Sequence, residues 1–474
     1  MKEHRKSYLN PLRLLNIILA LSFHSLMSFK KFNLIIKRKI SHFKKEIKVD
    51  SDKSISIRSF LIGAISHNVS SVNNVLESED VLSAINCLKK LGVKIKKKNS
   101  RSYLIYGKGL GSLFIKKNSQ LNFGNSGTLA RLLIGILATT PDIEVKIQGD
   151  RSLNKRSMKK LIKIMSEFGA FFFPKNKYNF PLKIISSEAP VGINFKAGVS
   201  AQIKSAVVLA ALNSNGTTKI IEHHKSRDHT EKMLSNNSWA IKIRDHRKKI
   251  INIYGKKFLN PLKINVPGDP SSAAFFIALT ILNKNSSLKI KNVGLNPTRI
   301  GFYKLLKKHG AKIKFDNLKQ INNEIRGNIF AKSSKLKPIN APKIYYVNST
   351  DEYPILFVVA ALTKGVSIFK GIEDLANKES NRVKEMQNIL NQVNIKSVYS
   401  KNKLKIFGKG IIDASKKKII IENLGDHRIC MSSFILSILT GAQTKIKNFE
   451  TVFTSSPSFL KIIKSLGAKF EIQR

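Results

Sequence analysis

The chain has 474 residues, of which 42% are hydrophobic, and a formal net charge of +54. This length exceeds one ordinary hydrophobic core, so two or three domains are expected, and the apolar fraction is ample for a globular fold. The charge does not indicate a nucleic-acid-binding protein, because the lysines are spread over nearly every amphipathic segment instead of forming one stripe. We expect no nucleic-acid partner, although such a field attracts small anions.

Residues 1–37 precede the first repeated unit and are expected to be an N-terminal extension. They combine a basic start with an apolar stretch at 14–29, which is short for a membrane span and is interrupted by polar residues. No small-residue cleavage site of a secretory signal peptide follows it. We expect no membrane association and favour the hypothesis that translation starts at Met27. N-terminal sequencing that found residues 1–26 in the native protein would contradict this.

An almost wholly apolar helix is predicted six times, each time directly after a polar turn. A helix that is apolar on all sides must be buried. The turns recur at intervals of 70 to 82 residues, at 53–54, 125–128, 200–202, 269–272, 351–354 and 425–428. Because a helix N-terminus carries unpaired N–H groups and a partial positive charge, we expect six positions that face anions.

A second pattern recurs with the same spacing: an amphipathic basic helix that ends in a small residue before a strand. Four copies end in a glycine, the usual left-handed C-terminal cap, and two are degraded. The glycines are Gly92, Gly169, Gly310 and Gly467, and the degraded copies have Trp239 and Asn394. Two patterns that agree sixfold predict internal repeats of about 75 residues, each with a buried helix, a surface helix and strands.

Six repeats in two domains give three repeats per domain. A strand-like segment at 263–266 divides the chain near its middle, and a similar basic strand at 44–49 precedes the first buried helix. We expect a first domain at 52–265 and a second domain made of 38–51 and 266–474. The chain then crosses twice between the domains, and all six buried-helix N-termini face one interdomain cleft that closes around a ligand.

Arginine is much rarer than lysine in this chain, yet six arginines lie in or beside the polar turns or in similar short motifs. They are Arg58, Arg131, Arg156, Arg227, Arg382 and Arg428. A guanidinium grips phosphate or carboxylate through two parallel hydrogen bonds, which an ammonium cannot do. This placement predicts small, multiply charged ligands. The alternative is pairing with structural carboxylates, which we expect most for Arg131.

The two cysteines, Cys87 and Cys430, have no metal-ligand spacing and are too few for a disulfide framework. They fit a reducing compartment, so we expect a cytoplasmic protein. We expect no metal and no cofactor.

Nine short motifs resemble those of the 5-enolpyruvylshikimate-3-phosphate synthases, in the order of that family and from about residue 44 to the C-terminus. They are DKSISIR (52–58), GNSGTLARLL (124–133), GDRSLNKRSM (149–158), SAQIKSAVVLAAL (200–212), SRDHTEKML (226–234), VPGDPSSAAFF (266–276), DEYPIL (351–356), NKESNR (377–382) and GDHRICMS (425–432). They are most similar to the bacterial branch typified by glyphosate-tolerant members. The resemblance implies the α/β, two-domain enolpyruvyl transferase fold, with six βαβαββ-like repeats around buried helices and the active site in the interdomain cleft.

The reaction that the resemblance implies moves the enolpyruvyl group of phosphoenolpyruvate onto the 5-hydroxyl of shikimate 3-phosphate and releases phosphate. It needs a base for the hydroxyl, an acid for the methylene carbon and cations for the phosphates and carboxylates. Asp351 matches the family's base, Glu379 its proton donor, and Lys53 a further catalytic group. Read without the resemblance, Asp351 is a helix N-cap and Glu379 lies at a solvated helix start.

The resemblance also assigns residues to the two substrates. For shikimate 3-phosphate these are Lys53, Ser54, Arg58, Ser200, Ala201, Gln202, Arg227, Asp351 and Lys378. For phosphoenolpyruvate they are Lys53, Gly127, Arg156, Gln202, Arg382 and Arg428. Gly127 lets the main chain approach that ligand closely, so we predict inhibition by glyphosate. The turn at 269–272 has no assigned ligand and is expected to be a structural cap beside the hinge.

The chain departs from the family pattern at several positions. Asp50-Ser51 replaces a Pro-Gly pair, and Ile57 replaces a histidine. Ser157 replaces a proline and Asn381 an aspartate. Thr454 stands where some branches carry a lysine, so other cations must take that role. None of these changes removes a principal catalytic group.

Two other functions stay open. The sister transferase that acts on UDP-N-acetylglucosamine shares the fold but uses a loop cysteine as proton donor, and no cysteine lies between residues 88 and 429. An RNA-end-processing or RNA-binding protein of related topology is favoured only by the charge. Phosphate release from phosphoenolpyruvate that depends on shikimate 3-phosphate distinguishes these functions. We expect a monomer.

Overall fold

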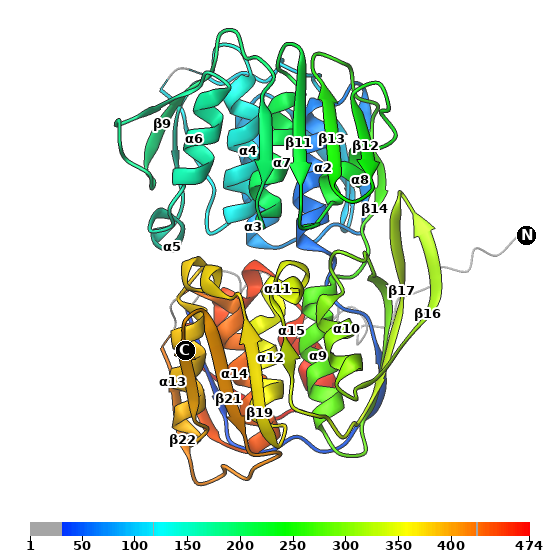
Figure 1. Cartoon of the computed structure of the whole chain (residues 1–474), viewed down its shortest axis with the longest axis vertical. Helices are drawn as coiled ribbons and strands as arrows, with labels where there is room; N and C mark the ends of the chain where they lie inside the picture. The colour runs from blue at the N-terminus through cyan, green and yellow to red at the C-terminus, as the bar shows by residue number, and fades with distance from the viewer. Residues whose placement is uncertain (1–30, 117, 423–424) are drawn as a thin grey trace, which may run out of the picture.

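The structure, a computed structural model, describes residues 31–116, 118–422 and 425–474. Figure 1 shows two lobes stacked along the long axis. Two hydrophobic clusters correspond to them: one spans 55–266, and the other combines 32–49 with 273–468. The stretch at 14–29 and the start at Met27 lie outside the described residues. Within the described ranges, no helix is long and apolar enough to cross a membrane.

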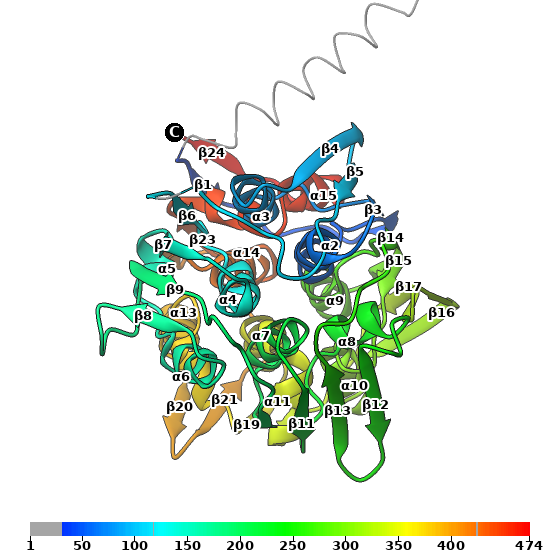
Figure 2. The ribbon, with the colours of Figure 1, turned by 90° about the horizontal axis from the view of Figure 1, so that it is seen from above.

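Six helices that are buried along most of their length form the centres of the two lobes, and the predicted buried helices are thereby confirmed. They are α2 (Lys53–Ile65), α4 (Gly127–Thr139) and α7 (Ala201–Ala211) in the first lobe, and α9 (Pro270–Leu282), α12 (Tyr353–Ala361) and α14 (His427–Thr440) in the second. Figure 2 shows α2, α4, α7, α9 and α14 toward the middle of the molecule, with strands around the rim.

The starts of five buried helices are fixed by side-chain caps. Each cap oxygen accepts a hydrogen bond from a backbone N–H of the first turn, which would otherwise lack a partner. The capping residues are Asp52, Ser126, Ser200, Asp269 and Asp426. The predicted cap role of 269–272 is therefore confirmed.

The sixth buried helix, α12, starts differently. Its N-cap is Glu352, whose side chain makes no capping hydrogen bond. Asp351 lies one residue earlier, in the 3₁₀ turn η1 (Thr350–Glu352). The interpretation of Asp351 as a helix N-cap is therefore wrong.

Three four-stranded sheets surround the helices of the first lobe, in the orders β14-β3-β5-β4, β6-β7-β9-β8 and β10-β11-β13-β12. Their strands are β3 (Val69–Asn73), β4 (Lys94–Asn99), β5 (Ser102–Tyr106), β6 (Gln120–Asn122), β7 (Glu144–Gln148), β8 (Phe171–Phe173), β9 (Leu182–Ile185), β10 (Asn194–Ala197), β11 (Thr217–Glu222), β12 (Ile241–Asp245), β13 (Lys249–Tyr254) and β14 (Lys263–Asn265). In each sheet the first two strands of the order pair in parallel and the remaining pairs are antiparallel.

The second lobe repeats this arrangement in the orders β2-β15-β17-β16, β18-β19-β21-β20 and β22-β23-β1-β24. Its strands are β1 (Asn33–Ile36), β2 (Lys44–Ile47), β15 (Ser287–Gly294), β16 (Lys312–Ile321), β17 (Glu324–Lys332), β18 (Asn340–Ala341), β19 (Gly365–Lys370), β20 (Ser397–Ser400), β21 (Lys403–Gly408), β22 (Lys418–Ile421), β23 (Gln443–Ile446) and β24 (Glu471–Gln473). Six sheets of one topology around six buried helices confirm the predicted six-repeat α/β fold.

The N-terminal strands lie in the second lobe. β1 pairs with β23 and β24, with Leu34 opposite Ile446 and Ile472. Residues 33–36 therefore belong to a sheet, and the expected extension, 1–37, reaches too far. Strand β1 was mistaken for part of the extension because, within the described ranges, it pairs only with β23 and β24, which lie more than 400 residues later.

Outer helices complete the repeats. They are α3 (Glu79–Lys90), α5 (Arg151–Asn154), α6 (Lys159–Glu167), α8 (His229–Leu234), α10 (Gly301–Lys308), α11 (Lys343–Ser349), α13 (Arg382–Gln392) and α15 (Phe459–Ser465), with further 3₁₀ turns at Glu373–Asn377 and Phe449–Thr454. The four predicted cap glycines have φ from +81° to +99°, and Asn394 takes the same left-handed region at +59°. Trp239 does not adopt a positive φ.

Candidate active site

A cleft of about 880 Å³ lies between the two lobes, at the N-terminal ends of buried helices. Every residue that the resemblance assigned to the reaction or to a substrate lines it. These residues are Lys53, Ser54, Arg58, Gly127, Arg156, Ser200, Ala201, Gln202, Arg227, Asp351, Lys378, Glu379, Arg382 and Arg428. Distant parts of the sequence thus meet in one strongly cationic cavity.

Asp351 reaches across the cleft to the first lobe. Its Oδ2 lies 2.6 Å from Nη1 of Arg227, and its Oδ1 lies 3.8 Å from Nη1 of Arg382. Burial would raise the pKa of this carboxyl, but Arg227, Arg428 and Arg382 outweigh burial and hold the pKa well below its usual value. Asp351 is therefore ionised, as a general base must be.

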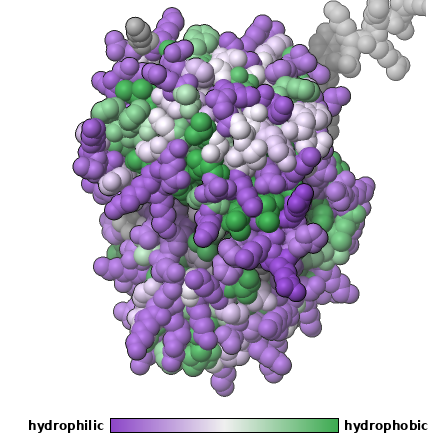
Figure 3. Space-filling view, turned by 45° about the horizontal axis from the view of Figure 1, so that its top comes forward, coloured by the Kyte–Doolittle hydropathy of each residue, from purple (hydrophilic) through white to green (hydrophobic). Residues whose placement is uncertain are grey.

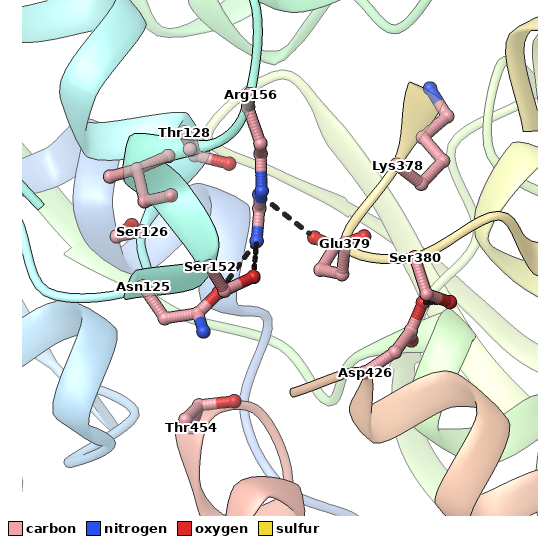
Figure 4. A network of polar contacts seen from close by, with 12 residues as sticks. Asn125, Ser126, Thr128, Ser152, Arg156, Lys378, Glu379, Ser380, Asp426 and Thr454 are labelled. Atoms are coloured by element: carbon pink, nitrogen blue, oxygen red, sulfur yellow. Dashed lines mark hydrogen bonds and ion pairs between the residues drawn. The ribbon is translucent and has the colours of Figure 1, made fainter. Parts of the chain in front are cut away.

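Glu379 is held between arginines of both lobes, as Figure 4 shows for its contact with Arg156. Oε1 lies 3.2 Å from Nη1 of Arg156, and Oε2 lies 2.6 Å from Nη2 of Arg382. Burial alone would raise the pKa of Glu379, yet the two guanidinium groups lower it well below its usual value. Without a ligand this carboxylate is ionised.

Asn125 orients Arg156 from the turn before α4. The Arg156 Nη2 group donates to Asn125 Oδ1 at 2.6 Å, and Asn125 Nδ2 donates to Asp150 Oδ2 at 2.8 Å. Asp150 also caps the short helix α5, which precedes Arg156. Asn125 stands inside a motif that carries the resemblance, but the sequence assigned it no role.

Arg382 and Arg428 carry buried donors that face the cleft. Arg382 is fixed by Asp426, which accepts from its Nε at 2.8 Å. Burial would lower the pKa of Arg382, but Asp426 and Glu379 raise it, so the guanidinium stays charged. Arg382 Nη1 and Arg428 Nε and Nη1 are buried and find no hydrogen-bond acceptor among the described residues. Such donors are complementary to an anion.

Lys53 joins both lobes at the first residue of α2. Its ammonium lies 2.9 Å from Oδ2 of Asp80 on α3, and its backbone N–H donates to Asp269 Oδ2 at 3.3 Å. Asp80 was missed, because nothing in the sequence of an amphipathic outer helix marks one of its acidic residues as a partner of the site.

Arg58 and its neighbours form part of the cleft lining on the side of the first lobe. The guanidinium donates to Ser54 O at 3.0 Å, Thr230 Oγ1 at 2.9 Å and Ser205 Oγ at 3.2 Å. Burial lowers the pKa of Arg58 to about 10. Ser200 caps α7 beside this group, so the helix N-terminus opens into the cleft.

Within residues 31–116, 118–422 and 425–474, Arg131 pairs with no structural carboxylate, in contrast to our expectation. Its Nη1 donates to Gln202 Oε1 at 2.7 Å and to Gly127 O at 3.0 Å, and it lines the cleft. Burial lowers its pKa to about 10. Gln202 in turn donates to Thr128 Oγ1 at 2.9 Å. Arg131 therefore orients Gln202.

Lys378 and His427 complete the second-lobe wall. Lys378 Nζ lies 2.5 Å from Asp374 Oδ2. Burial lowers the pKa of His427 well below its usual value, and Lys53 lowers it further, so the imidazole is neutral. His427 lies in the GDHRICMS motif at 425–432, yet no sequence pattern assigned it a role. Thr454, the position of the missing lysine, also lines the cleft.

The repeated fold and the cleft with two carboxylates among arginines define the class of the protein: it is an enolpyruvyl transferase. The crystal structure of the enolpyruvyl transferase NikO from Streptomyces tendae shares the fold, with a TM-score of 0.70 over 94% of this chain and 99% of NikO, at 12% identity. EPSP synthase from Acinetobacter baumannii is more similar, with a TM-score of 0.79, 32% identity and coverage of 94% of this chain and 100% of that one.

Sequence comparison narrows the class to one family. The profile of EPSP synthase (3-phosphoshikimate 1-carboxyvinyltransferase) matches residues 37–463. The 3-phosphoshikimate 1-carboxyvinyltransferases of Thermodesulfovibrio yellowstonii (39% identical, 92% of this chain and 99% of the relative) and Bacillus subtilis (36%, 90% and 97%) are similar throughout. The chain belongs to the EPSP synthase family. As an enzyme of this family, it transfers the enolpyruvyl group of phosphoenolpyruvate to shikimate 3-phosphate in the shikimate pathway.

Proposed function

We propose that Asp351 is the base that takes the proton from the 5-hydroxyl of shikimate 3-phosphate, and that Glu379 donates the proton to the methylene carbon of phosphoenolpyruvate. Their position supports these roles, because both carboxyl groups line one cleft and their side chains are only 28% and 19% exposed. Lys53, which is tied to both lobes, adds the positive charge that stabilises the developing anion.

The two substrates divide the cleft between them in this proposal. Shikimate 3-phosphate lies mainly against the first-lobe side of the cleft and partly against the second-lobe side. Its contacts are Lys53, Ser54, Arg58, Ser200, Ala201, Gln202, Arg227, Asp351 and Lys378. Phosphoenolpyruvate lies against Lys53, Gly127, Arg156, Gln202, Arg382 and Arg428. The buried donors of Arg382 and Arg428 for which the described part of the chain offers no acceptor support the second assignment.

Substrate binding changes the partners of the catalytic carboxylates. Phosphoenolpyruvate competes with Glu379 for Arg156 and Arg382, which hold the pKa of Glu379 low in the empty cleft. Once those guanidinium groups bind the ligand's anionic oxygens, the pKa of Glu379 rises and the group takes up the proton that it must donate. The phosphate of the other substrate draws Arg227 from Asp351 in the same way, which makes Asp351 a stronger base.

We further propose that the lobes are two domains that close on the substrates. The first domain is 52–265, and the second combines the N-terminal segment that contains β1 and β2 with residues 266–474. The two crossings between them lie at the cleft, where Ser51 and Gly268 form an isolated β-bridge. We also propose a cytoplasmic monomer that is inhibited by glyphosate and needs neither a metal nor a cofactor.

The observation that carries the assignment is the meeting of Asp351 and Glu379 in one arginine-lined cleft of a family member. Phosphate release should require both substrates, and Asp351→Asn should lower kcat about 100- to 10,000-fold because the base is lost. Asp413→Asn, at an exposed residue of the same lobe, should retain full activity. Phosphate release without shikimate 3-phosphate, or an active Asp351→Asn variant, would contradict the proposal.

A further inference from the structure

Arg299 lies at the junction of the two lobes, between β15 and α10, and only 2% of it is exposed. Its Nη1 donates to Asp52 Oδ2 at 3.2 Å, and its Nη2 donates to Asp269 Oδ1 at 3.2 Å. Burial would lower the pKa of Arg299, but these carboxylates raise it, so the guanidinium is charged. One side chain therefore links residues of both lobes.

The two carboxylates are the N-caps of α2 and α9, and they mark the two places where the chain crosses between the lobes. Asp52 Oδ1 accepts from the N–H of Ile55 at 2.9 Å, and Asp269 Oδ1 accepts from that of Ser271 at 2.7 Å. Asp269 Oδ2 also accepts from the N–H of Lys53. Arg299 thus sets the distance and the angle between the starts of two buried helices, one from each lobe.

A third element, α8 of the first lobe, contacts the same guanidinium. Arg299 Nη1 lies 3.1 Å from Nε2 of His229, and Nδ1 of His229 lies 2.6 Å from Oε1 of Glu324 in the second lobe. A guanidinium only donates, so Nε2 accepts and Nδ1 carries the hydrogen that Glu324 receives. α8 begins at His229, two residues after Arg227, so the position of Arg227 depends on this contact as well.

The fourth contact leads to the proposed base. Arg299 Nη2 donates to Ser271 Oγ at 2.9 Å, and Ser271 Oγ donates to Oε1 of Glu352. Glu352 is buried in the same 3₁₀ turn as Asp351. The turn that carries Asp351 is thus fixed through two hydrogen bonds to the residue that joins the lobes.

We propose that Arg299 is a positioning residue for the transfer reaction: it holds the two interlobe crossings in register, so that closure brings Asp351 and Arg227 to the substrate in one geometry. The inference rests on the proposed roles of Asp351 and of lobe closure. The planar fork of arginine is required, because an ammonium supplies the charge but cannot bridge two carboxylates, an imidazole and a hydroxyl with fixed angles.

The test compares Arg299→Lys and Arg299→Met with the wild-type enzyme. We expect kcat to fall about tenfold in the lysine variant and about 100-fold in the methionine variant, because misplaced reacting groups lose rate steeply. KM for shikimate 3-phosphate should change less than about threefold, since most of its proposed contacts lie on the first lobe. When shikimate 3-phosphate is added, small-angle X-ray scattering should show a smaller decrease in the radius of gyration for both variants than for the wild-type enzyme.

Arg326→Lys is the matched control. Arg326 is a second-lobe arginine that is 5% exposed and also donates across the lobes, to Asn265 O at 2.6 Å, but it contacts neither helix cap, so it controls for the loss of an interlobe hydrogen bond as such. Its variant should keep wild-type kcat and contraction. If both Arg299 variants keep the wild-type kcat and the wild-type contraction, the inference about Arg299 is overturned, but the proposed function is not. If the methionine variant does not fold, the lysine variant decides, because it keeps a charge between the carboxylates. A wild-type protein that releases no phosphate would overturn the proposed function as well.

Discussion

Each catalytic carboxylate has a low pKa for the same reason: a guanidinium that is proposed to bind a substrate binds the carboxylate while the cleft is empty. Arg227 pairs with Asp351, and Arg382 and Arg156 pair with Glu379. The empty site thereby avoids a cluster of uncompensated buried cations, which would be costly. The same ion pairs couple substrate binding to the protonation states of Glu379 and Asp351.

The acid limb of the pH–rate profile should report this coupling. Asp351 acts in its ionised form, and Arg227 is the cation that lowers its pKa most. Arg227→Met removes that charge, so the pKa of Asp351 rises and the acid limb of kcat/KM moves to higher pH. Arg227→Lys keeps a positive charge and should move the limb less. Acid limbs at the same pH in both variants would contradict the assignment of Asp351.

A methyl group at Gly127 should weaken phosphoenolpyruvate binding. An added Cβ would lie 2.7 Å from Nη1 of Arg131 and 2.9 Å from Nη1 of Arg156. Both guanidinium groups must shift, so kcat/KM for phosphoenolpyruvate should fall about 10- to 100-fold in Gly127→Ala.

The inhibition constant of glyphosate should also rise in Gly127→Ala, and an unchanged constant would contradict the predicted contact. Gly198→Ala is the control, because Gly198 lines the same cleft and a Cβ there meets no atom within 4 Å. It should leave both constants near their wild-type values.

The residues predicted from motifs all line the cleft, whereas those missed came from two sources. Asn125 and His427 stand in the recognised motifs, and a closer reading of each helix start would have included them. Asp80 and Arg299 stand outside them, and their partners are more than 20 residues away. Without knowledge of the fold, no local pattern identifies such pairs.

At the scale of elements, a buried ion cluster supports the loop that carries Arg227. Lys204 on α7 lies 2.9 Å from Oε1 of Glu222 and 2.7 Å from Oε1 of Glu231, and all three side chains are essentially inaccessible. Glu222 Oε1 accepts from the N–H of Ser226 at 2.8 Å and from its Oγ at 2.6 Å. The cluster thus fixes the backbone directly before Arg227.

Removing the cation should destabilise the fold strongly. Lys204→Met removes the ammonium beside the buried Glu222 and leaves Glu231 with Lys249 at 3.4 Å, so the free energy of unfolding should fall by about 3–5 kcal/mol. Lys225→Met is the control, because its pair with Asp245 is exposed and should contribute no more than about 1 kcal/mol. Urea denaturation measures both. Equal losses in the two variants would show that burial of the Lys204 cluster does not matter.

The predicted secondary structure is correct for elements whose position depends only on their own residues. Five of the six buried helices start where a capping oxygen precedes an apolar run, and this information is local. The boundary at residue 37 was wrong because β1 is recognisable only from its neighbours β23 and β24. The Asp351 cap was wrong because an extra 3₁₀ turn precedes α12.

At the scale of the whole molecule, the net charge acts on substrate capture. Figure 3 shows a largely hydrophilic face with scattered apolar patches, and Lys160, Lys163 and Lys196 line the cleft. Both proposed substrates are anions, so the field should raise their association rates. We infer that the charge favours capture and does not indicate a polymeric nucleic-acid ligand.

Reversing charge beside the cleft should therefore slow capture. The double variant Lys163→Glu/Lys196→Glu should lower kcat/KM about tenfold at low salt and leave kcat nearly unchanged. The difference should shrink at about 0.5 M salt, where surface charges are screened.

Lys416→Glu/Lys417→Glu changes the net charge equally but lies beyond the C-terminal end of α14, since Lys417 donates its N–H to Ala414 and Ala414 to Thr440. Because α14 points its N-terminus at the cleft, this control should keep kcat/KM. An equal loss in both double variants would show that only total charge matters.

The sequence by itself determined the repeats, the buried helices and the family, because periodicity, capping and short motifs are properties of contiguous residues. Tertiary structure alone decided which charges meet. Lys53 with Asp80, Arg227 with Asp351 and Arg299 with two helix caps are pairings between distant segments. Their energies depend on burial and on distances of a few ångströms, and these exist only once the six repeats have packed into two lobes.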